Sequence, residues 1–322
     1  MTQEKARKKN VLISGVTSTL GRQVANQLYF DNKIGTIIGT SVGDRPYYFE
    51  DFNPKKFIYK QTDILKTRQL QNLFLSEDFK LANIDTVIHL AFYNRLEEYT
   101  EESHKLNVEG TKNLLDMCVE TQLIKKFIFK SSHIVYKIKS ENPVLLEEEA
   151  DLNFSNDVDP WVRDRVDADM ICQARMESKN ISIVILRPTN IVGRNIHGTL
   201  NAYFDSPFCI KPMGYNPMIN LIHVRDVVNA IQLCVHKNVH GIFNLSGRET
   251  APLSEFIRLN KARKLNVPGP LIPPVNRILR RIGLTRHYYR VEADLMHYSS
   301  LLDDSRARKI LGWESKNHIR FG

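Results

Sequence analysis

The sequence predicts an α/β fold, with a doubly wound parallel sheet followed by a smaller C-terminal α+β lobe. Through the first two thirds of the 322 residues, short apolar runs alternate with amphipathic helical stretches. The apolar runs are continuous, which is typical of parallel strands that helices cover on both faces. The later part is richer in proline and basic residues. It suits a lobe over the carboxyl ends of the strands, where such sheets bind ligands.

Each expected element follows from its pattern and length. The expected strands are residues 10–14, 36–40, 56–60, 86–91, 126–131 and 182–188. The amphipathic segments 21–30 and 104–121 are expected to be helices that cover the sheet. A late apolar run, residues 241–246, is expected to join the same sheet. Strand and helix therefore alternate as they do in strand–helix–strand units.

Composition and cysteine spacing limit the class of protein. The apolar fraction of 42% is ordinary for a globular protein, and no apolar run is long enough to span a bilayer. The basic N-terminus lacks the apolar stretch of a secretory signal, so residues 1–9 are expected to be a disordered tail. The four cysteines lack the paired spacing of zinc sites and disulfide frameworks. We therefore expect no metal site and a cytoplasmic location.

Positive charge is concentrated late in the chain. The formal net charge is +9, and residues 248–290 contain ten Lys and Arg against Glu249 and Glu255. Such a segment can attract nucleic acid, an anionic membrane or a phosphorylated ligand, or it can be an ordinary solvated face. Aromatic residues do not alternate with the basic ones as in nucleic-acid motifs. A nucleic-acid partner is therefore the weakest of these interpretations.

The segment VLISGVTSTLG, residues 11–21, predicts a strand, a tight turn and a helix. Gly15 permits the turn and Gly21 lets the helix pack closely on the strand, so that the first N–H groups of the helix would face a pyrophosphate. A Gly-x-x-Gly-x-x-Gly turn would have its middle glycine at the position of Ser18. Alone, this pattern is a weak indication of dinucleotide binding, because glycine turns before helices are common.

The end of the second strand bears on the choice of cofactor. An acid there usually accepts hydrogen bonds from the adenosine ribose, but this chain has Ser41. Arg22 and Arg45 are candidates for binding a 2′-phosphate, which favours NADP over NAD, although they are equally well interpreted as surface arginines. Asp63 is a candidate partner for the adenine amino group.

Several short motifs occur in a fixed order between about Asn10 and Trp313. They are the glycine turn, TDI (62–64), VIHLAF (87–92), NVEGTKNLL (107–115), FIFKSSHIVY (127–136), LRPTNIVG (186–193), IHVRDV (222–227) and LDDSRARKILGW (302–313). Together they resemble the extended short-chain dehydrogenase/reductases of the NAD-dependent epimerase/dehydratase family. The resemblance implies a Rossmann fold that binds NAD or NADP. It implies cofactor contacts and site residues at Leu20, Ile64, Leu90, Ala91, Pro188, the supporting Asn107 and the catalytic serine Ser132.

The expected domain division combines the motifs with the composition. Residues 10–193 plus 221–247 are expected to form the dinucleotide-binding Rossmann domain. Residues 194–220 plus 248–322 are expected to form the substrate lobe. By the same resemblance, the segments 104–121 and 161–179 are the helices through which family members often form homodimers.

The family's next motif is Tyr-x-x-x-Lys, in which the tyrosine acts as acid or base and the lysine holds the nicotinamide ribose. The matching stretch is DPWVRDRVDADM, with Trp161 at the tyrosine position and Arg165 at the lysine position. An indole N–H donates a hydrogen bond but releases no proton near neutral pH. Arg165 can still bind ribose hydroxyls, although its planar fork fits differently. Half of the implied catalytic pair is therefore chemically absent.

Other residues near the expected site have structural as well as catalytic interpretations. Tyr93 and Tyr136 follow strands and can approach the cleft, but packing is the favoured interpretation of both. His133 is expected on the opposite face from Ser132, because adjacent strand residues point to opposite faces. His89 is expected to be a core histidine with hydrogen-bond partners.

Three functions agree with these features. The favoured one is an NAD(P)-binding protein with little or no catalytic activity that acts as a sensor or scaffold. The second is an active reductase or nucleotide-sugar epimerase/dehydratase in which water or the substrate supplies the proton. The third is a basic surface protein that binds through residues 248–290. A nucleotide sugar or another phosphorylated small molecule is the ligand that the family analogy suggests.

Overall fold

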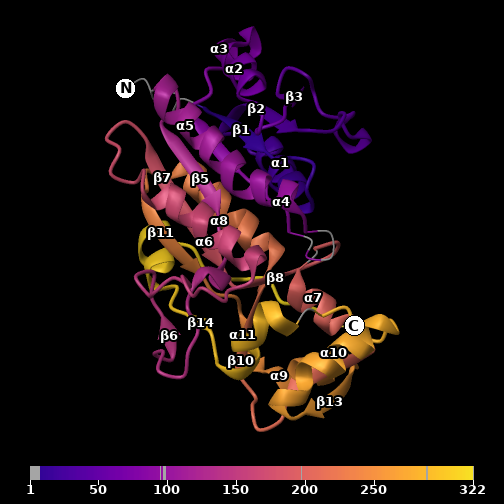
Figure 1. Cartoon of the computed structure of the whole chain (residues 1–322). Helices are drawn as coiled ribbons and strands as arrows, with labels where there is room; N and C mark the ends of the chain where they lie inside the picture. Colours follow the sequence, from indigo (N-terminus) through magenta and orange to yellow (C-terminus); the bar gives the residue numbers. More distant parts are fainter. Residues whose placement is uncertain (1–7, 95, 97–98, 197, 288, 322) are drawn as a thin grey trace.

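A seven-stranded parallel sheet forms the centre of the computed structural model, which describes residues 8–94, 96, 99–196, 198–287 and 289–321 (Figure 1). The strand order is β11-β7-β5-β4-β1-β2-β3, and every neighbouring pair is parallel. The strands are β1 (Lys9–Ser14), β2 (Ile34–Ser41), β3 (Phe57–Gln61), β4 (Thr86–His89), β5 (Lys126–Lys130), β7 (Ser182–Pro188) and β11 (Gly241–Leu245). The predicted doubly wound sheet, including its late strand, is confirmed.

The strand order reverses beside β1. Strands β1 to β3 extend the sheet in one direction, and the chain then places β4 on the other side of β1. Open α/β sheets bind ligands at such a switch point, outside the carboxyl ends of the strands. Because β1 ends at Ser14 and β4 ends at His89, the residues that follow these two positions border the expected crevice.

Helices cover both faces of the sheet (Figure 1). On one face, α1 (Thr19–Tyr29) and α8 (Val224–His236) share a core cluster with Ile13. On the other face, the cluster around Leu12 includes residues of α2 (Thr67–Leu75), α3 (Glu77–Ala82), α5 (Thr111–Thr121) and α6 (Pro160–Gln173). Leu12 and Ile13 are both fully buried, which explains why this strand is continuously apolar.

The helix expected over 104–121 begins earlier and contains an irregular turn. It starts as α4 (Glu101–Lys105), passes through a π-helical turn (Leu106–Gly110) and continues as α5. Thr100 caps α4 by a reciprocal contact with Ser103. Single π-helical turns are frequent at functional sites, and this one contains Asn107.

The remaining elements form three small sheets and their covering helices. The sheets are β8 (Asn190–Val192) with β10 (Met218–His223) and β12 (Glu249–Pro252), β9 (Phe208–Pro212) with β13 (Arg263–Val267), and β6 (Leu145–Leu146) with β14 (Leu301–Leu302). The helices are α7 (Thr199–Phe204), α9 (Leu253–Leu259), α10 (Ile272–Arg281) and α11 (Ala293–His297). Tyr203, Phe204 and Phe256 belong to a separate apolar cluster. A smaller C-terminal region of mixed sheets is thus present, as predicted.

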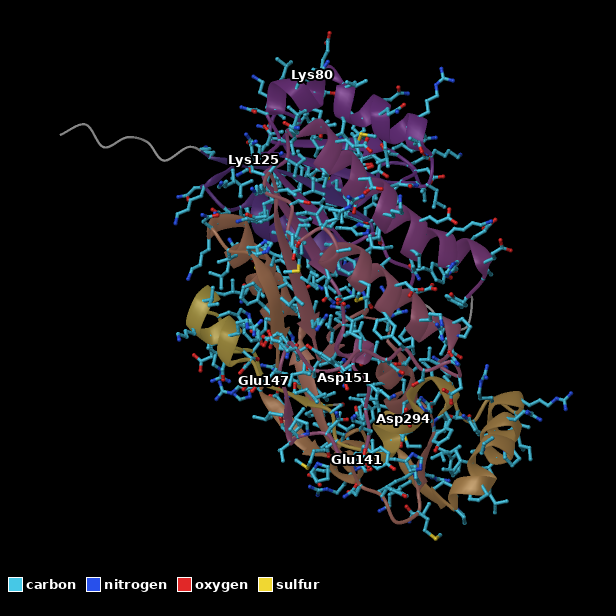
Figure 2. The ribbon with its side chains drawn as sticks, turned by 60° about the vertical axis from the view of Figure 1, so that its left-hand side comes forward. Lys80, Lys125, Glu141, Glu147, Asp151 and Asp294 are labelled. Carbon is cyan, nitrogen blue, oxygen red and sulfur yellow. The ribbon has the colours of Figure 1, made fainter. Side chains whose placement is uncertain are left out.

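The predictions about the chain as a whole have different outcomes. Strand β1 already begins at Lys9, so the tail predicted over 1–9 extends too far, and residues 1–7 lie outside the described residues. The division into 10–193 plus 221–247 and 194–220 plus 248–322 stays a prediction. Within the described residues, no helix is long and apolar enough to cross a membrane. Charged side chains such as Lys80, Lys125 and Glu141 are exposed (Figure 2).

Candidate functional site

The predicted glycine turn connects β1 to α1. Gly15 has a φ of +70°, and a Cβ there would lie 2.5 Å from the backbone nitrogen of Ala91. A Cβ on Gly21 would lie 2.3 Å from the carbonyl oxygen of Gly15. Neither position accepts a side chain unless the backbone moves. Gly15 therefore lets the turn approach the end of β4, and Gly21 lets α1 pack closely against the turn.

Ser18 is the N-cap of α1 and replaces the middle glycine without backbone strain. Its φ of −65° and ψ of 157° are extended values that other residues adopt readily. Its hydroxyl donates to the carbonyl oxygen of Gly15 at 2.8 Å and accepts the N–H of Gly21 at 3.0 Å. Because serine is a preferred N-cap, the substitution stabilises the start of α1.

Arg22 and Arg45, the candidates for a 2′-phosphate, contact the short helical turn Tyr47–Phe49. The Arg22 guanidinium lies over the ring of Tyr48, 4.9 Å from its centroid. Arg45 donates from Nη2 to the carbonyl oxygen of Phe49 at 2.5 Å. Both guanidinium groups therefore already have partners in the protein.

Ser41, Asp63 and Ile64, expected beside the adenosine, hold neighbouring segments together. The hydroxyls of Ser41 and Thr17 lie 2.8 Å apart, which ties the end of β2 to the glycine turn. The Asp63 carboxylate accepts the N–H of Leu65 at 3.0 Å. Ile64 is buried in the core cluster on the α5 face. These contacts give all three a structural role, and their contact with a ligand stays a prediction.

A cavity of about 400 Å³ opens at the carboxyl ends of β1, β4, β5 and β7. Trp161 and Arg165, which stand at the tyrosine and lysine positions of the motif, are called the dyad positions. We call this space the dyad cavity, because residues of the glycine turn meet the dyad positions there. The predicted site residues that line it are Ser18, Leu20, Leu90, Ser132, Trp161, Arg165 and Pro188. Those that do not line it are Gly15, Gly21, Arg22, Ser41, Arg45, Asp63, Ile64, Ala91 and Asn107.

Trp161 and Arg165 form a buried stacked pair near the start of α6. Asp159 caps this helix by accepting the N–H of Trp161 at 2.9 Å. The Arg165 guanidinium lies 3.2 Å from the centroid of the Trp161 ring. It donates to the carbonyl oxygen of Trp161 at 2.6 Å and to Asn94 Oδ1 at 2.9 Å. Burial lowers the pKa of Arg165, but a guanidinium stays protonated near neutral pH. The pair therefore offers a cation and an N–H donor, and no acid or base.

The indole Nε1 of Trp161 is buried and has no hydrogen-bond partner among the described residues. A buried donor without an acceptor costs about 1–3 kcal/mol, so such groups need an explanation. Trp161 also lines the dyad cavity. The indole can thus replace a tyrosine hydroxyl as a donor, but it cannot replace it as an acid.

Asn107, expected to support the site, connects the π-helical turn to both sides of the cavity. Its Oδ1 accepts the N–H of Tyr93 at 2.7 Å, and its Nδ2 donates to Asp164 at 3.0 Å. Asp164 also accepts the hydroxyl of Tyr99 at 2.8 Å, and its other oxygen lies 2.6 Å from His104 Nδ1. This network fixes the segment after β4 against α6 without using either dyad position.

A buried ion pair joins α6 to β7. Arg187 donates to the two oxygens of Asp169 at 2.6 and 3.0 Å, and Ser131 donates to the same carboxylate. Burial alone lowers the pKa of Arg187, but its hydrogen bonds to Asp169 raise that pKa overall. The pair remains charged and anchors α6 beside the serine segment.

The structure shows that the prediction for His133 is wrong. Strand β5 ends at Lys130, and His133–Val135 form a 3-10 turn. Ser132 caps this turn, because its hydroxyl accepts the N–H of Ile134 at 3.4 Å. The alternation of a strand does not continue through the turn, so Ser132 and His133 both line the dyad cavity. Burial lowers the pKa of His133 to about 4, so the ring is neutral at pH 7.

Lys130 also lines the dyad cavity and is absent from the predicted site residues. Burial, followed by the charge of Arg165, lowers its pKa to about 8. In the sequence its only signal is a charged residue at the end of an apolar strand, which is a common pattern. Tyr93 lines the same cavity, so one of the two tyrosines does approach it.

Two structural interpretations are confirmed. The ring nitrogens of His89 lie 2.7 Å from the hydroxyl of Ser14 and 2.9 Å from that of Thr111, as expected for a core histidine. Tyr136 is buried and donates to Asn244 Oδ1 at 2.6 Å. Packing is therefore the role of Tyr136.

Residues 11–246 match the model of the NAD dependent epimerase/dehydratase family. The chain belongs to this family. The matched region runs from β1 to the end of β11 and contains the glycine turn, the serine segment and the dyad positions. The family assignment therefore covers the whole seven-stranded sheet.

Relatives include an uncharacterized protein of Mycobacterium tuberculosis, 25% identical over 252 residues, which cover 77% of this chain and 66% of that protein. A dTDP-D-glucose 4,6-dehydratase of Dictyostelium discoideum is 27% identical over 266 residues, which cover 74% of this chain and 58% of that protein. The chain thus spans about two thirds of the length of the first relative and less of the second.

Solved structures share the fold over nearly the whole chain. The dTDP-glucose 4,6-dehydratase of Bacillus anthracis in complex with NAD has a TM-score of 0.69 at 17% identity, covering 96% of this chain and 92% of its own. The UDP-glucose 4-epimerase of Thermotoga maritima with UDP-glucose has a TM-score of 0.70 at 17% identity, covering 96% and 94%. At this identity the likeness concerns the fold.

Proposed function

We propose that this chain binds a nicotinamide dinucleotide between the glycine turn and the dyad cavity, and that it does not carry out tyrosine-dependent proton transfer. The observation that carries the proposal is the buried stack of Arg165 on Trp161, at 3.2 Å. This stack fills both dyad positions with groups that do not titrate near neutral pH. Positioned proton transfer contributes about 10²–10⁴-fold in rate, so its loss leaves little turnover.

The residues present fit a dinucleotide at both ends of the site. A Cβ on Gly15 or Gly21 would collide with the backbone of Ala91 or of Gly15, so these two glycines allow the close packing of a dinucleotide-binding turn. The start of α1 supplies N–H groups and the positive end of a helix dipole to a pyrophosphate. Trp161 supplies a buried N–H donor that has no partner among the described residues. A bound cofactor brings hydride chemistry of its own, and the residues of this chain bind and orient it.

For the cofactor we propose NAD(H), in place of the NADP(H) that the sequence slightly favours. The guanidinium groups of Arg22 and Arg45 contact the 47–49 turn, so a 2′-phosphate would have to displace these contacts. A dinucleotide-binding protein without turnover suits a sensor or scaffold. A nucleotide sugar or another phosphorylated compound as second ligand, and dimers formed through α5 and α6, remain part of the proposal.

Fluorescence titration with NADH, applied to wild type and to variants of Ser18, tests whether the dinucleotide binds at the glycine turn. Ser18→Asp and Ser18→Asn both retain a preferred helix cap, but only aspartate places a negative charge beside the pyrophosphate. We expect wild type and Ser18→Asn to bind NADH alike, and Ser18→Asp to bind about tenfold more weakly, or ~1.4 kcal/mol. Equal binding by all three would contradict the proposed site, and no binding by wild type would contradict the function. NADPH in parallel tests the cofactor choice.

The position and lowered pKa of Lys130 favour a second candidate function, that of an active reductase or epimerase with a different proton donor. An ammonium group with a pKa of about 8 in the dyad cavity exchanges its proton near neutral pH, as catalytic acids and bases do. This candidate predicts turnover whose rate–pH profile has an inflection near that pKa. Lys130→Met should abolish the turnover while NADH still binds. A wild type that converts none of a panel of UDP- and dTDP-sugars excludes the candidate.

A further inference from the structure

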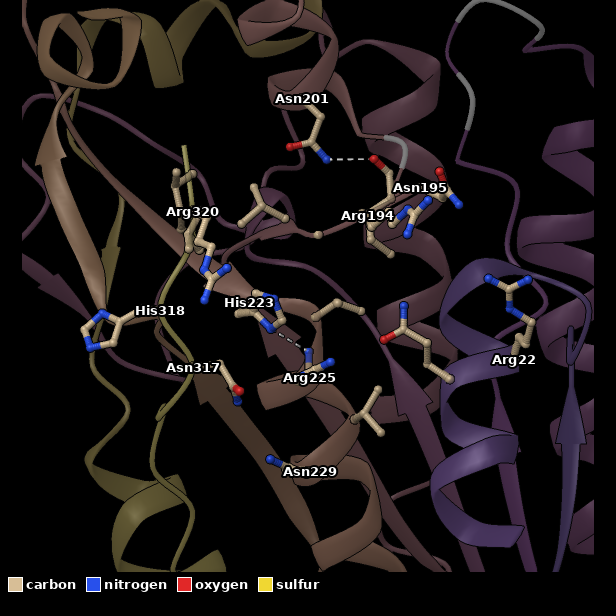
Figure 3. Close-up of a pocket in the computed structure, with 18 of the residues that line it drawn as sticks. Arg22, Arg194, Asn195, Asn201, His223, Arg225, Asn229, Asn317, His318 and Arg320 are labelled. Carbon is tan, nitrogen blue, oxygen red and sulfur yellow. Dashed lines mark hydrogen bonds between the residues drawn. The ribbon is translucent and has the colours of Figure 1, made fainter. Parts of the chain in front are cut away.

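The positive charges of the segment 256–291 lie outside the cavities of the molecule that have been described. The segment contains nine Lys and Arg and no Asp or Glu. None of those whose side chains the structure describes lines the dyad cavity. None of them lines a second cavity, of about 1840 Å³, whose arginines come from other segments (Figure 3). The described ones are all exposed, so this charge belongs to the outer surface.

Helix α10 carries part of this charge on a side that also exposes apolar side chains. Ile272 and Asn276 are buried on the inner side of the helix. Leu271, Ile278 and Ile282, in the helix or directly beside its ends, are 53%, 59% and 60% exposed. Their spacings of seven and four residues place these three on one side of the helix. The solvent side of α10 is therefore partly apolar.

Two arginines run beside this apolar row. Arg277 and Arg281 are four residues apart, as are Ile278 and Ile282, so the two pairs form adjacent rows along the helix. In the part of the chain that the structure describes, neither guanidinium group forms an ion pair or a hydrogen bond. A cation at the C-terminal end of a helix stabilises its dipole, which explains Arg281. It does not explain the exposed isoleucines, whose contact with water is unfavourable.

The surroundings of α10 leave this face open to a large partner. Figure 1 shows the helix on the outside of the C-terminal region, away from the seven-stranded sheet. Leu271, Arg277, Ile278, Arg281 and Ile282 together are called the α10 face. All five are exposed, so a flat surface can contact the apolar and the basic row at the same time.

We propose that the α10 face binds the surface of an anionic lipid bilayer. A basic amphipathic helix lies in the plane of such a surface, with its apolar side chains at the boundary of headgroups and acyl chains and its cations at the acidic headgroups. A nucleic acid would attract the arginines through its phosphates, but it offers no apolar environment to Ile278 and Ile282. The apolar row therefore favours the bilayer. The α10 face contains no residue of the dinucleotide site, so the proposal is independent of cofactor binding.

Co-sedimentation of the full chain with lipid vesicles tests the proposal, at ~0.15 M salt to screen weak surface attraction. Vesicles of phosphatidylcholine and phosphatidylserine in equal parts are compared with vesicles of phosphatidylcholine alone. The two test variants change one row each, and they are Arg277→Gln/Arg281→Gln and Ile278→Ser/Ile282→Ser.

Helices α2 and α3 provide matched controls, because they expose residues of the same two kinds. Arg68→Gln/Lys80→Gln removes the same charge as the arginine variant. Leu75→Ser/Leu81→Ser removes two exposed apolar side chains, as the isoleucine variant does. Circular dichroism checks that each variant is folded.

We expect wild type and both controls to bind the mixed vesicles alike, and phosphatidylcholine vesicles much more weakly. Each test variant should bind the mixed vesicles about tenfold more weakly or worse. Any of four results would overturn the proposal: no binding of wild type to the mixed vesicles, equal binding to both kinds of vesicle, unchanged binding by either test variant, or equal weakening by the controls. Wild type that binds duplex DNA through the arginine row, and no vesicles, would assign the face to nucleic acid.

A tryptophan probe separates insertion of the apolar row from attraction by charge alone. The native Trp161 and Trp313 are buried, so their emission should change little on contact with vesicles. The emission of Ile278→Trp should shift to shorter wavelength on the mixed vesicles, and that of Leu81→Trp should not. No shift in Ile278→Trp would contradict insertion and overturn the proposal.

Discussion

The glycine turn and the dyad positions lie at two ends of one proposed site, and they follow the family pattern to different degrees. At the turn, a Cβ on Gly15 or Gly21 would lie 2.5 or 2.3 Å from backbone atoms. Ser18 replaces a glycine where its φ of −65° allows any residue. At the dyad positions, Trp161 and Arg165 stand where the resemblance implies a tyrosine and a lysine. Backbone packing limits which residues fit in the glycine turn. At the dyad positions, the family pattern depends on the chemistry of the side chains.

Under the proposed function, this difference means that a family frame can be complete where its catalytic groups are not. Asn107 and Asp164 join α6 to the segment after β4, and Asp169 and Arg187 join it to β7. None of these contacts uses the side chain of Trp161. These contacts anchor α6 through residues other than the one at the tyrosine position.

Removing a supporting contact at the dyad end gives the largest expected effect on stability. Asp169→Ala leaves Arg187, which is 1% exposed, as an uncompensated buried charge, at a cost of about 3–5 kcal/mol. Urea denaturation should show a much lower midpoint. Asp151→Ala is the control, because this carboxylate is 75% exposed (Figure 2) and such changes stay within about 0.5 kcal/mol. If both variants lost equally little unfolding free energy, the position of α6 would not depend on the Asp169–Arg187 ion pair.

Acid pH gives a smaller effect at the same end. The pKa of His133 falls from 6.5 to about 4 on folding because the ring is buried. Between these values the unfolded chain binds a proton that the folded chain does not. Stability is therefore complete above pH 6.5 and falls as pH falls through this window. From about pH 7 to 5 the loss due to His133 is about 2 kcal/mol.

The variant His133→Gln isolates this contribution. The unfolding free energies of wild type and variant, each measured by urea denaturation at the two pH values, should differ in their pH dependence by that amount. Identical pH dependence of the unfolding free energy would mean that His133 is not held neutral in the folded protein.

The order of strands and helices is predictable because each buried strand is a continuous apolar run between helical segments. The orientation of His133 is not, because the alternation rule fails once β5 ends at Lys130 and a 3-10 turn begins. The chemistry of Lys130 depends on burial and on Arg165, far along the chain. The second cavity, of about 1840 Å³, is lined by residues as distant as Arg22 and Arg320, and no local pattern marks such a set.

The most direct test of the central claim compares wild type with Trp161→Tyr/Arg165→Lys, after both have been shown to bind NADH. Each protein is incubated with NAD and with UDP-glucose or dTDP-glucose, and the sugar nucleotides are analysed by chromatography. We predict that the variant, with its acid–base pair restored, forms product about 10²-fold or more faster than wild type. Product formation by wild type at the rate of the variant would contradict the account.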